Sequence, residues 1–254
     1  ERYGLIVPIA VPEPYGLTPS AEPPGEFLAD ASQPTRRGVF VRRERATRDI
    51  EDCFDDLLTV DPQSDGATVT SRRVEVFDPI LHVAEVSFAG VKVADSERLS
   101  ADTERARHVA LMGMAITMVG ACQRILDLVI EHAKSRQQFG VLIGTFQAVQ
   151  HLLADSLVRV EGARSCVWHA AWAVDHLPAD QALLAARTAK AYASASGRDV
   201  VETAMQVLGG ISITWEHASH LRLRRTLLNR RLFGDESAQY AAIADMRLAD
   251  RELS

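Results

Sequence analysis

The segment RQQFGVLIGTFQAVQHLLADS, residues 136–156, determines how the second half of the chain is interpreted. A Phe-Gly pair and a second glycine interrupt a helical pattern, and glutamines then accompany the apolar positions. We expect Gly140 to end a long helix as a left-handed residue just past its C-terminus. Gly144 and Thr145 are expected to begin the next helix, with Gln147 in its first turn. The segment is thus predicted to be a break between two core helices.

The same break has the composition of an anion site. A helix N-terminus presents free backbone N–H groups and partial positive charge, which favour a phosphate. Arg136 lies one turn before the break and can clamp an anion with two donors. Phe139 can lie against a planar ring. Taken alone, these features are a weak signal and fit an ordinary helix boundary with no ligand better than an anion site.

Helical periodicity extends on both sides of this break. After residue 100 the chain contains one proline, Pro178. The apolar spacing predicts a set of long helices joined by short connections, so sequence neighbours should be antiparallel. Their expected ranges are 102–136, 144–176, 179–208 and 216–230, with a last helix from about 237. The third is rich in alanine, which fits either tight packing inside the bundle or a subunit interface.

The first hundred residues have a different character. They hold nine of the ten prolines, which remove backbone donors and break helices. DGATVTSRRVEV (65–76) and HVAEVSFAGVKV (82–93) alternate in the manner of strands. We therefore predict an α+β chain, with a β-rich domain over residues 1–100 that has a loop-heavy start. An antiparallel four-helix bundle is predicted over residues 101–254.

The composition narrows the possible functions. The net charge of −6 offers no basic surface for nucleic acid. The three cysteines are widely separated, which suggests neither a disulfide framework nor a metal knuckle and fits a reducing cytoplasm. No apolar run is expected to span a membrane. The first residues have neither the basic start nor the cleavage site of a signal peptide. Arg222, Arg224, Arg225, Arg230 and Arg231 form a dense run, which fits a solvated or inter-helix face or an anion site.

A second glycine-containing segment is QVLGGISITWEH, residues 206–217. Gly209 and Gly210 follow the alanine-rich helix, where they allow positive φ angles and close approach of a ligand to the backbone. A glycine pair after a helix is not a Rossmann fingerprint, because that motif follows a strand. On its own the pair is compatible with a simple helix cap.

The segments together resemble the acyl-CoA dehydrogenase family. The resemblance rests on RQQFGVLIGTFQAVQHLLADS, on AKAYASASGRDVVETAMQVLGGISITWEH and on LRLRRTLLNRRLFGDES, and covers about residues 100–245 without an evident gap. Upstream it thins, although DDLLTV and VSFAGVKV are similar to the later strands of the family's β domain. We find no match to the family's N-terminal helical domain or to its Trp-containing segment that packs on the flavin.

The resemblance implies a helical bundle after a β domain, tetrameric assembly and FAD bound at a dimer interface. The adenine and pyrophosphate half of FAD would be held by Arg136, Phe139, Phe146 and Gln147. The backbone cradle for that half would be Gln206, Val207, Leu208, Gly209 and Gly210. The implied partners are an acyl-CoA substrate, an electron-transfer acceptor and further subunits.

The catalytic base expected from the family is absent from the matching positions. The usual glutamate would fall at Phe233, and an alternative position on the first bundle helix is Ala110. The arginine that often accompanies the usual base would fall at Leu111. Asp235 and Glu236 are the only nearby carboxylates, and they read more readily as residues that cap the last helix.

Other constellations point to no separate chemistry. His217 and His220, three residues apart and near Glu216, lack a third ligand cluster, so we predict surface histidines and no metal site. Trp168, Trp172 and Trp215 are expected to fill core or interface space.

Three functional hypotheses remain open from the sequence. The first is an FAD-binding subunit without a base, similar to one chain of the actinobacterial two-plus-two heterotetramers that act on steroid-derived CoA thioesters. The second is a self-sufficient homotetramer that uses Asp235 or Glu236 as its base. The third is a scaffold of the same fold that binds no flavin.

Overall fold

The structure is a computed structural model that describes residues 3–6, 38–42, 56–60, 68–74, 78, 83–89 and 103–252. The chain divides into two compact units. One comprises residues 1–46 and 52–101 and contains the strands β1 to β5. The other comprises residues 47–51 and 102–254 and contains all the described helices.

The first unit contains antiparallel strands. Its described elements are β1 (Tyr3–Ile6), β2 (Gly38–Arg42), β3 (Asp56–Val60), β4 (Thr68–Val74) and β5 (Val83–Ala89). Three of them form a sheet in the order β1-β5-β4, and β2 pairs with β3. The two stretches that alternate in sequence become β4 and β5, with Arg72 opposite Glu85 in the register. The remaining parts of the predicted β-rich domain lie outside the described residues, so that domain stays a prediction.

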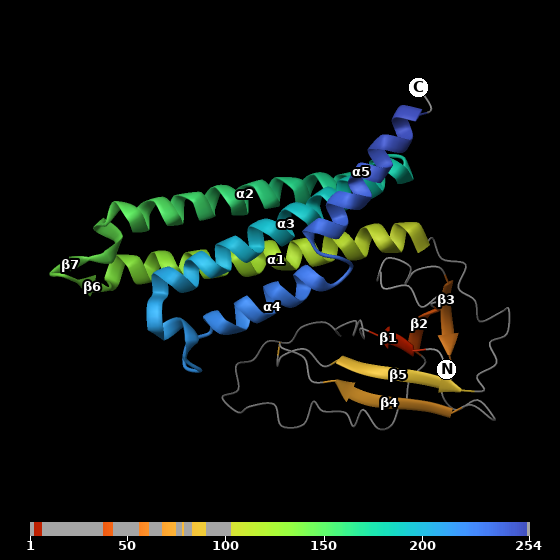
Figure 1. Ribbon diagram of the computed structural model, residues 1–254, viewed down its shortest axis with the longest axis horizontal. Helices are drawn as coiled ribbons and strands as arrows, with labels where there is room; N and C mark the ends of the chain where they lie inside the picture. Colours follow the sequence, from red (N-terminus) through yellow and green to blue (C-terminus); the bar gives the residue numbers. More distant parts are fainter. Residues whose placement is uncertain are drawn as a thin grey trace. The chain divides into compact units, whose positions relative to one another are not determined.

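The second unit is a bundle of long helices (Figure 1). They are α1 (Thr103–Ser135), α2 (Gln147–His176), α3 (Ala179–Leu208), α4 (Ser219–Arg231) and α5 (Glu236–Glu252). Short connections join α1 to α2 and α2 to α3, which makes these neighbours antiparallel. The predicted antiparallel bundle is confirmed, with α5 as a fifth helix against α3.

The alanine-rich helix α3 is the centre of this bundle. It packs against α1, α2, α4 and α5. Ala186 and Ala189 are fully buried, and Gly197 lies so close to α4 that an added Cβ would be 3.1 Å from the Thr226 methyl carbon. Small side chains thus let the helices approach closely, and tight packing inside the bundle accounts for the alanines on this face.

Helix α1 shows one departure from the sequence prediction. By length and hydropathy alone it could cross a bilayer, so the expectation that no run reaches that length is wrong for this helix. Its apolar side chains have another use here, because Met118, Ile125 and Val129 are fully buried in the bundle core. One face of α1 therefore belongs to the bundle core.

Candidate functional site

The predicted break at the end of α1 is a β-hairpin rather than a glycine cap. Helix α1 already ends at Ser135, and the two-residue strands β6 (Gln137–Gln138) and β7 (Val141–Leu142) pair across a Phe139-Gly140 turn. The φ angles are 54° at Phe139 and 81° at Gly140, as a two-residue hairpin turn of this twist requires. Gly140 is therefore not the C-terminal residue of α1, and this prediction is corrected.

This hairpin displays an aromatic ring in an unusual setting. Phe139 is 92% exposed, and its ring centroid is 6.3 Å from that of Phe146 in an edge-to-face pair. A bulky residue with positive φ is strained, and strain of this kind is concentrated at functional sites. The two phenylalanines thus form an exposed aromatic edge in the segment that follows Arg136.

The return from the hairpin to α2 is tightly fixed. The Ile143 amide donates to the Arg136 carbonyl oxygen at 2.9 Å, and the Gln150 side chain donates to the Gly144 carbonyl oxygen at 2.9 Å. A Cβ on Gly144 would lie 2.9 Å from the Ala133 carbonyl oxygen, so only glycine fits there. Gly144 and Thr145 belong to a short 3-10 turn (η3, Ile143–Thr145), and α2 begins later than predicted, at Gln147.

Helix α2 starts without a side-chain cap. Phe146 occupies the capping position and makes no side-chain hydrogen bond there. The first amides of α2 therefore have no partner from a cap, and Gln147 is exposed in the first turn. Uncapped amides next to an exposed arginine provide donors for an anion.

The glycine pair after α3 has two distinct requirements. Gly209 has φ 68° and ψ −147°, a region that side-chain-bearing residues avoid, so the backbone itself demands glycine. Gly210 has no positive φ, and a Cβ there would meet nothing within 4 Å. Neither conformation nor packing within the described residues explains Gly210. A ligand that approaches the backbone from outside would explain it.

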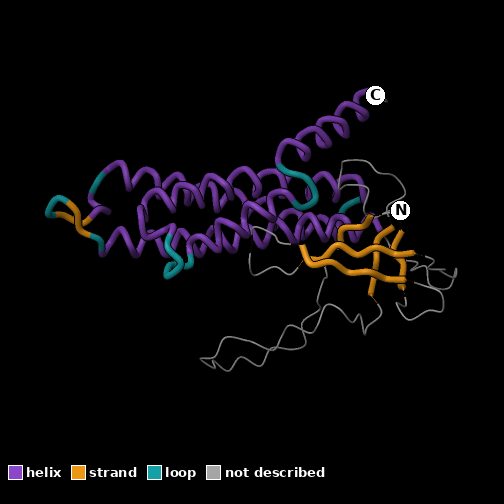
Figure 2. Tube along the Cα trace, turned by 60° about the horizontal axis from the view of Figure 1, so that its bottom comes forward, coloured by secondary structure: helices purple, strands orange, loops and turns teal. Residues whose placement is uncertain are grey.

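Helices α1 and α3 run in the same direction, so the two segments lie toward the same end of the bundle (Figure 1). Figure 2 shows the hairpin strands at that end in orange, beyond the purple helices. An electrostatic link supports their proximity. The pKa of His132, in the last turn of α1, is lowered by burial and then by Arg136 and by His217, which follows the glycine pair. The predicted convergence of the hairpin segment and the glycine segment is therefore compatible with the geometry.

The other predicted cofactor residues differ in what they can offer. Gln206 is exposed and available to a ligand, and Val207 is half-buried against the core. Leu208 is 5% exposed, so its side chain belongs to the core and only its backbone could contact a ligand. This part of the prediction therefore concerns main-chain groups.

The three positions where a base or its companion was sought are apolar. Leu111 is buried in the bundle core, Ala110 is half-buried beside it on α1, and Phe233 lies in the α4–α5 connection. Phe233 has φ 58° and precedes Gly234 with φ 82°. The connection thus holds a left-handed conformation at a residue that cannot accept a proton.

The two nearby carboxylates are committed to structural roles. Asp235 accepts hydrogen bonds from the Ser237 and Ala238 amides at 3.1 and 3.3 Å, which caps α5, and pairs with Arg231 at 3.0 Å. Glu236 receives two bonds from Arg230, at 2.7 and 2.5 Å. The hydrogen bond from Arg230 lowers the pKa of Glu236 below its usual value. A carboxylate held in this way is a weak proton acceptor.

Sequence reasoning missed a buried lysine below this connection. Lys190 has no exposed surface, and its ammonium group donates to Ser194 Oγ at 2.9 Å and to the carbonyl oxygens of Arg230 and Gly234 at 3.0 and 2.8 Å. Burial lowers its pKa to about 8. The Gln239 side chain donates to the Phe233 carbonyl oxygen. The sequence could have indicated this buried lysine, because Lys190 lies among the alanines that form the buried face of α3.

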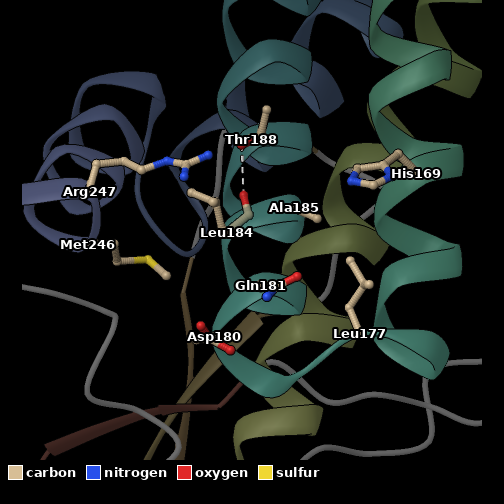
Figure 3. Close-up of a pocket in the computed structure, with 9 residues that line it drawn as sticks. All are labelled: His169, Leu177, Asp180, Gln181, Leu184, Ala185, Thr188, Met246 and Arg247. Carbon is tan, nitrogen blue, oxygen red and sulfur yellow. Dashed lines mark hydrogen bonds between the residues drawn. The ribbon is translucent and has the colours of Figure 1, made fainter. Parts of the chain in front are cut away.

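A cavity of about 610 Å³ lies at the opposite end of α3 (Figure 3). Leu177, Leu184 and Met246 supply apolar surface, and the lining residues Asp180 and Arg247 are exposed. It is separated from Gly209 by roughly 35 Å of helix, at about 1.5 Å per residue. No buried polar side chain in its lining defines a ligand, so the cavity does not compete with the hairpin end as a candidate site.

The prediction of surface histidines is wrong for His220, which is 8% exposed, and His217 is half-buried. Within the described residues, no three His, Cys, Asp or Glu side chains gather as metal ligands would. Trp168, Trp172 and Trp215 are 71%, 49% and 72% exposed, so they do not fill the core of this chain. Their predicted role at an interface stays a prediction.

Comparison with known proteins gives a consistent result. The profile of the acyl-CoA dehydrogenase C-terminal domain matches residues 104–248. IpdE2 of Mycobacterium tuberculosis, an acyl-CoA dehydrogenase, is 37% identical over 156 residues, which cover 61% of this chain and 45% of IpdE2. The acyl-CoA dehydrogenase FadE34 of the same organism is 36% identical over 168 residues, covering 66% of this chain and 23% of FadE34. This chain therefore matches less than half the length of either relative.

Solved structures agree with the sequence relatives. The steroid acyl-CoA dehydrogenase Tcur3481-Tcur3483 superposes with a TM-score of 0.71 at 27% identity, over 78% of this chain and 53% of that one. The ChsE4-ChsE5 complex of Mycobacterium tuberculosis gives a TM-score of 0.69 at 26% identity, over 75% and 51%. The match over the helical bundle, together with the hairpin and glycine segments, shows that the chain belongs to the acyl-CoA dehydrogenase family.

Proposed function

We propose that this chain is an FAD-binding subunit of an acyl-CoA dehydrogenase whose catalytic base comes from a partner subunit. The reaction is the α,β-desaturation of a CoA thioester, with electrons passed on to an electron-transfer acceptor. The observation that carries the proposal is the α4–α5 connection, where the expected base position is Phe233 and both neighbouring carboxylates are engaged by arginines.

The donor set at the hairpin end fits the phosphate-bearing half of FAD. Arg136 offers a planar guanidinium, α2 offers uncapped amides, and Gly210 leaves open space in which backbone and ligand can approach. Phe139 offers an exposed ring. Bound FAD would supply the hydride acceptor for the substrate β carbon.

The chain's own contribution is therefore binding and orientation. Arg136 and the first amides of α2 would neutralise and position the pyrophosphate. The Gly209–Gly210 backbone would determine how closely the pyrophosphate approaches the chain. Proton removal from the α carbon needs a carboxylate in its ionised form and within reach. Glu236 is ionised but bound to Arg230, so we assign that step to another chain.

The relatives support the assembly and the substrate class. The structures similar to this chain include the ChsE4-ChsE5 complex and the Tcur3481-Tcur3483 steroid acyl-CoA dehydrogenase. We therefore propose a two-plus-two heterotetramer that acts on a steroid-derived CoA thioester, in the cytoplasm.

The native particle tests this proposal directly. The chain is purified alone and together with a second acyl-CoA dehydrogenase-type subunit encoded beside it, and the subunit masses and the flavin content per chain are measured. We expect a mixed particle with activity, and no desaturation by the isolated chain. Full activity with stoichiometric FAD in the isolated chain would reject the proposal, and a colourless mixed particle would favour a scaffold.

The carboxylates provide the second test. Asp235→Asn and Glu236→Gln are made in the mixed particle, with Glu131→Gln, a surface glutamate paired with Lys134, as the control. We expect the rate of flavin reduction by a saturated acyl-CoA to be unchanged in all three. Loss of flavin reduction in either of the first two, with normal FAD content, would identify a base in this chain.

A further inference from the structure

The outer side of α2 carries large apolar side chains that face away from the bundle. The helix packs on α1 and α3 with its inner side, and Figure 1 shows it at the edge of the bundle away from α4. Val158, Trp168 and Trp172 are 69%, 71% and 49% exposed. They belong to a row of exposed residues spaced alternately by four and by three, Ala154, Val158, Glu161, Ser165, Trp168 and Trp172. This spacing lines up side chains on one side of a helix, as in the contact face of a coiled coil.

The aromatic end of this row is ordered within the helix itself. The Trp172 ring stacks between two imidazoles, with its centroid 6.1 Å from that of His169 and 5.0 Å from that of His176. His176 is held in turn, because its Nδ1 lies 2.8 Å from the Trp172 carbonyl oxygen. A side chain that is already ordered loses less conformational freedom when a partner covers it. Tryptophan is also among the residue types that contribute most to protein interfaces.

The row changes in size along its length. Its N-terminal part has the small side chains of Ala154 and Val158, and its C-terminal part has Trp168 and Trp172. A second copy of α2, laid antiparallel on the first, places Val158 opposite Trp168 of the other copy and Ala154 opposite Trp172. Each large ring then meets a small residue, on both sides of a two-fold axis. A parallel copy would instead set the tryptophans against each other and leave gaps between the small residues.

The charges beside the row fit the same antiparallel arrangement. Asp155 and His169 lie on the same flank of the row, and both are exposed. The register that pairs Val158 with Trp168 brings Asp155 of one copy beside His169 of the other, twice in the contact. Arg164 would lie near the axis, where its charge is balanced within its own chain by Glu161, 3.2 Å away. The face therefore matches a second copy of itself in size and in charge.

We propose that this outer row of α2, from Ala154 to Trp172, is the contact between two copies of this chain, packed antiparallel about a two-fold axis. The row is about 27 Å long. The inference rests on the proposed two-plus-two particle and deepens it, because it states which chains meet at this face. The two copies of this chain touch each other through α2, and the cofactor end of each copy is left for the second kind of subunit.

Cross-linking within the mixed particle tests the register directly. Val158→Cys and Trp168→Cys are introduced together, the particle is purified and oxidised glutathione is added. We expect a covalent dimer of this chain, seen by mass and on non-reducing gels. The two positions are about 15 Å apart along α2, too far for a disulfide within one chain. The controls are each single variant, which accounts for the native Cys166, and Val158→Cys with Ser165→Cys, which the register does not pair.

Weakening the contact gives the second measurement. Trp168→Glu and Trp172→Glu are made together, and the dissociation of the mixed particle is followed by analytical ultracentrifugation. We expect the four-chain particle to separate into pairs with one copy of this chain each, with its dissociation constant raised at least about 100-fold. Leu248→Glu on α5 is the control, since it places the same charge at a position that is 57% exposed. Dissociation like that of the wild type would overturn the inference.

These outcomes are separate from those of the proposed function. A mixed particle that contains FAD and desaturates its substrate, but gives no covalent dimer of this chain, leaves the proposed function standing and the α2 contact wrong. A disulfide between this chain and the second subunit also overturns the contact, because that subunit then covers the row. If the double glutamate variant fails to fold, the cross-linking result alone decides.

Discussion

The hairpin end of the bundle and the α4–α5 connection use their polar groups in opposite ways. At the hairpin end, Arg136 has no ion-pair partner among the described residues, α2 begins uncapped and Gly210 faces open space. In the α4–α5 connection, Lys190 and Glu236 are fully engaged within the chain. The first region therefore keeps donors that no group among the described residues uses, as the proposed cofactor site requires. The second is arranged to stay closed.

The largest expected effect is the loss of FAD affinity on a substitution at the hairpin end of the bundle. Arg136→Ala should weaken FAD binding about 100-fold, because a charge-assisted pair with a phosphate is worth about 2–3 kcal/mol. Lys134→Ala is the matched control, since Lys134 carries the same charge, lies two residues before Arg136 and is paired with Glu131 on the surface. Flavin fluorescence titration measures both. Equal affinities for the two variants would contradict an open phosphate site at Arg136.

The next largest effect is a loss of stability on a substitution that removes support from the α4–α5 connection. Lys190→Met keeps the side-chain volume but removes the donor for the carbonyl oxygens of Arg230 and Gly234, and buried acceptors left unpaired cost about 1–3 kcal/mol. We expect the free energy of unfolding to fall by about 2 kcal/mol in denaturant titration. Lys134→Met, on the surface, should change it by less than about 0.5 kcal/mol. A stable Lys190→Met variant would mean that the connection is held by packing alone.

The glycine pair allows two substitutions at this end of the bundle that should differ in their effects on stability and on FAD affinity. Gly209→Ala should lower the free energy of unfolding by about 1–2 kcal/mol, because its φ of 68° strains any other residue. Gly210→Ala should leave stability within about 0.5 kcal/mol, yet weaken FAD about 10-fold if ligand atoms occupy the space beside it. Thermal unfolding and FAD titration on the same samples separate the two. Equal FAD affinity for wild type and Gly210→Ala would remove the ligand explanation.

The most gradual effect is a pH dependence at the α4–α5 connection. The pKa of Lys190 is about 8 in the folded chain and 10.5 in a solvated lysine. Between these two pKa values the unfolded state binds more protons than the folded state. Lys190 therefore makes the free energy of unfolding rise with pH, by less than about 1.4 kcal/mol per pH unit. The difference between wild type and Lys190→Met isolates this contribution. A difference that falls from pH 8 to 10 would mean that the burial cost of Lys190 is overestimated.

The regular parts of the fold were accessible from the sequence. The predicted range 179–208 matches α3, because Pro178 and Gly209 mark its ends and alanines supply the periodicity. The hairpin at 137–142 was not predicted, since two-residue strands carry no periodic signal and positive φ at Phe139 contradicts its residue preference. Propensity favours a glycine cap there, and the contact between Gly144 and α1 overrides it.

The candidate site was predictable only in part. Arg136, Gly209 and Gly210 were found because they belong to a recognisable string of residues. Lys190 was missed and His217 was predicted only as a surface histidine, because what matters about both residues is their setting. The partners of Lys190 are 40 and 44 residues away, and the hydrogen bonds that hold His217 reach back to Gly209 through two serines. Contacts of this kind depend on tertiary packing, which residue type and local spacing do not encode.

The tight return of the hairpin has a consequence for how this region can vary. Gln137 pairs with Leu142, the Ile143 amide reaches back to Arg136, and Gly144 lies against Ala133, so the number of residues in the excursion is fixed at every step. A single insertion or deletion would shift the phase of all of α2 relative to α1. The number of residues in this excursion must therefore be preserved, in addition to the glycines that its turns require.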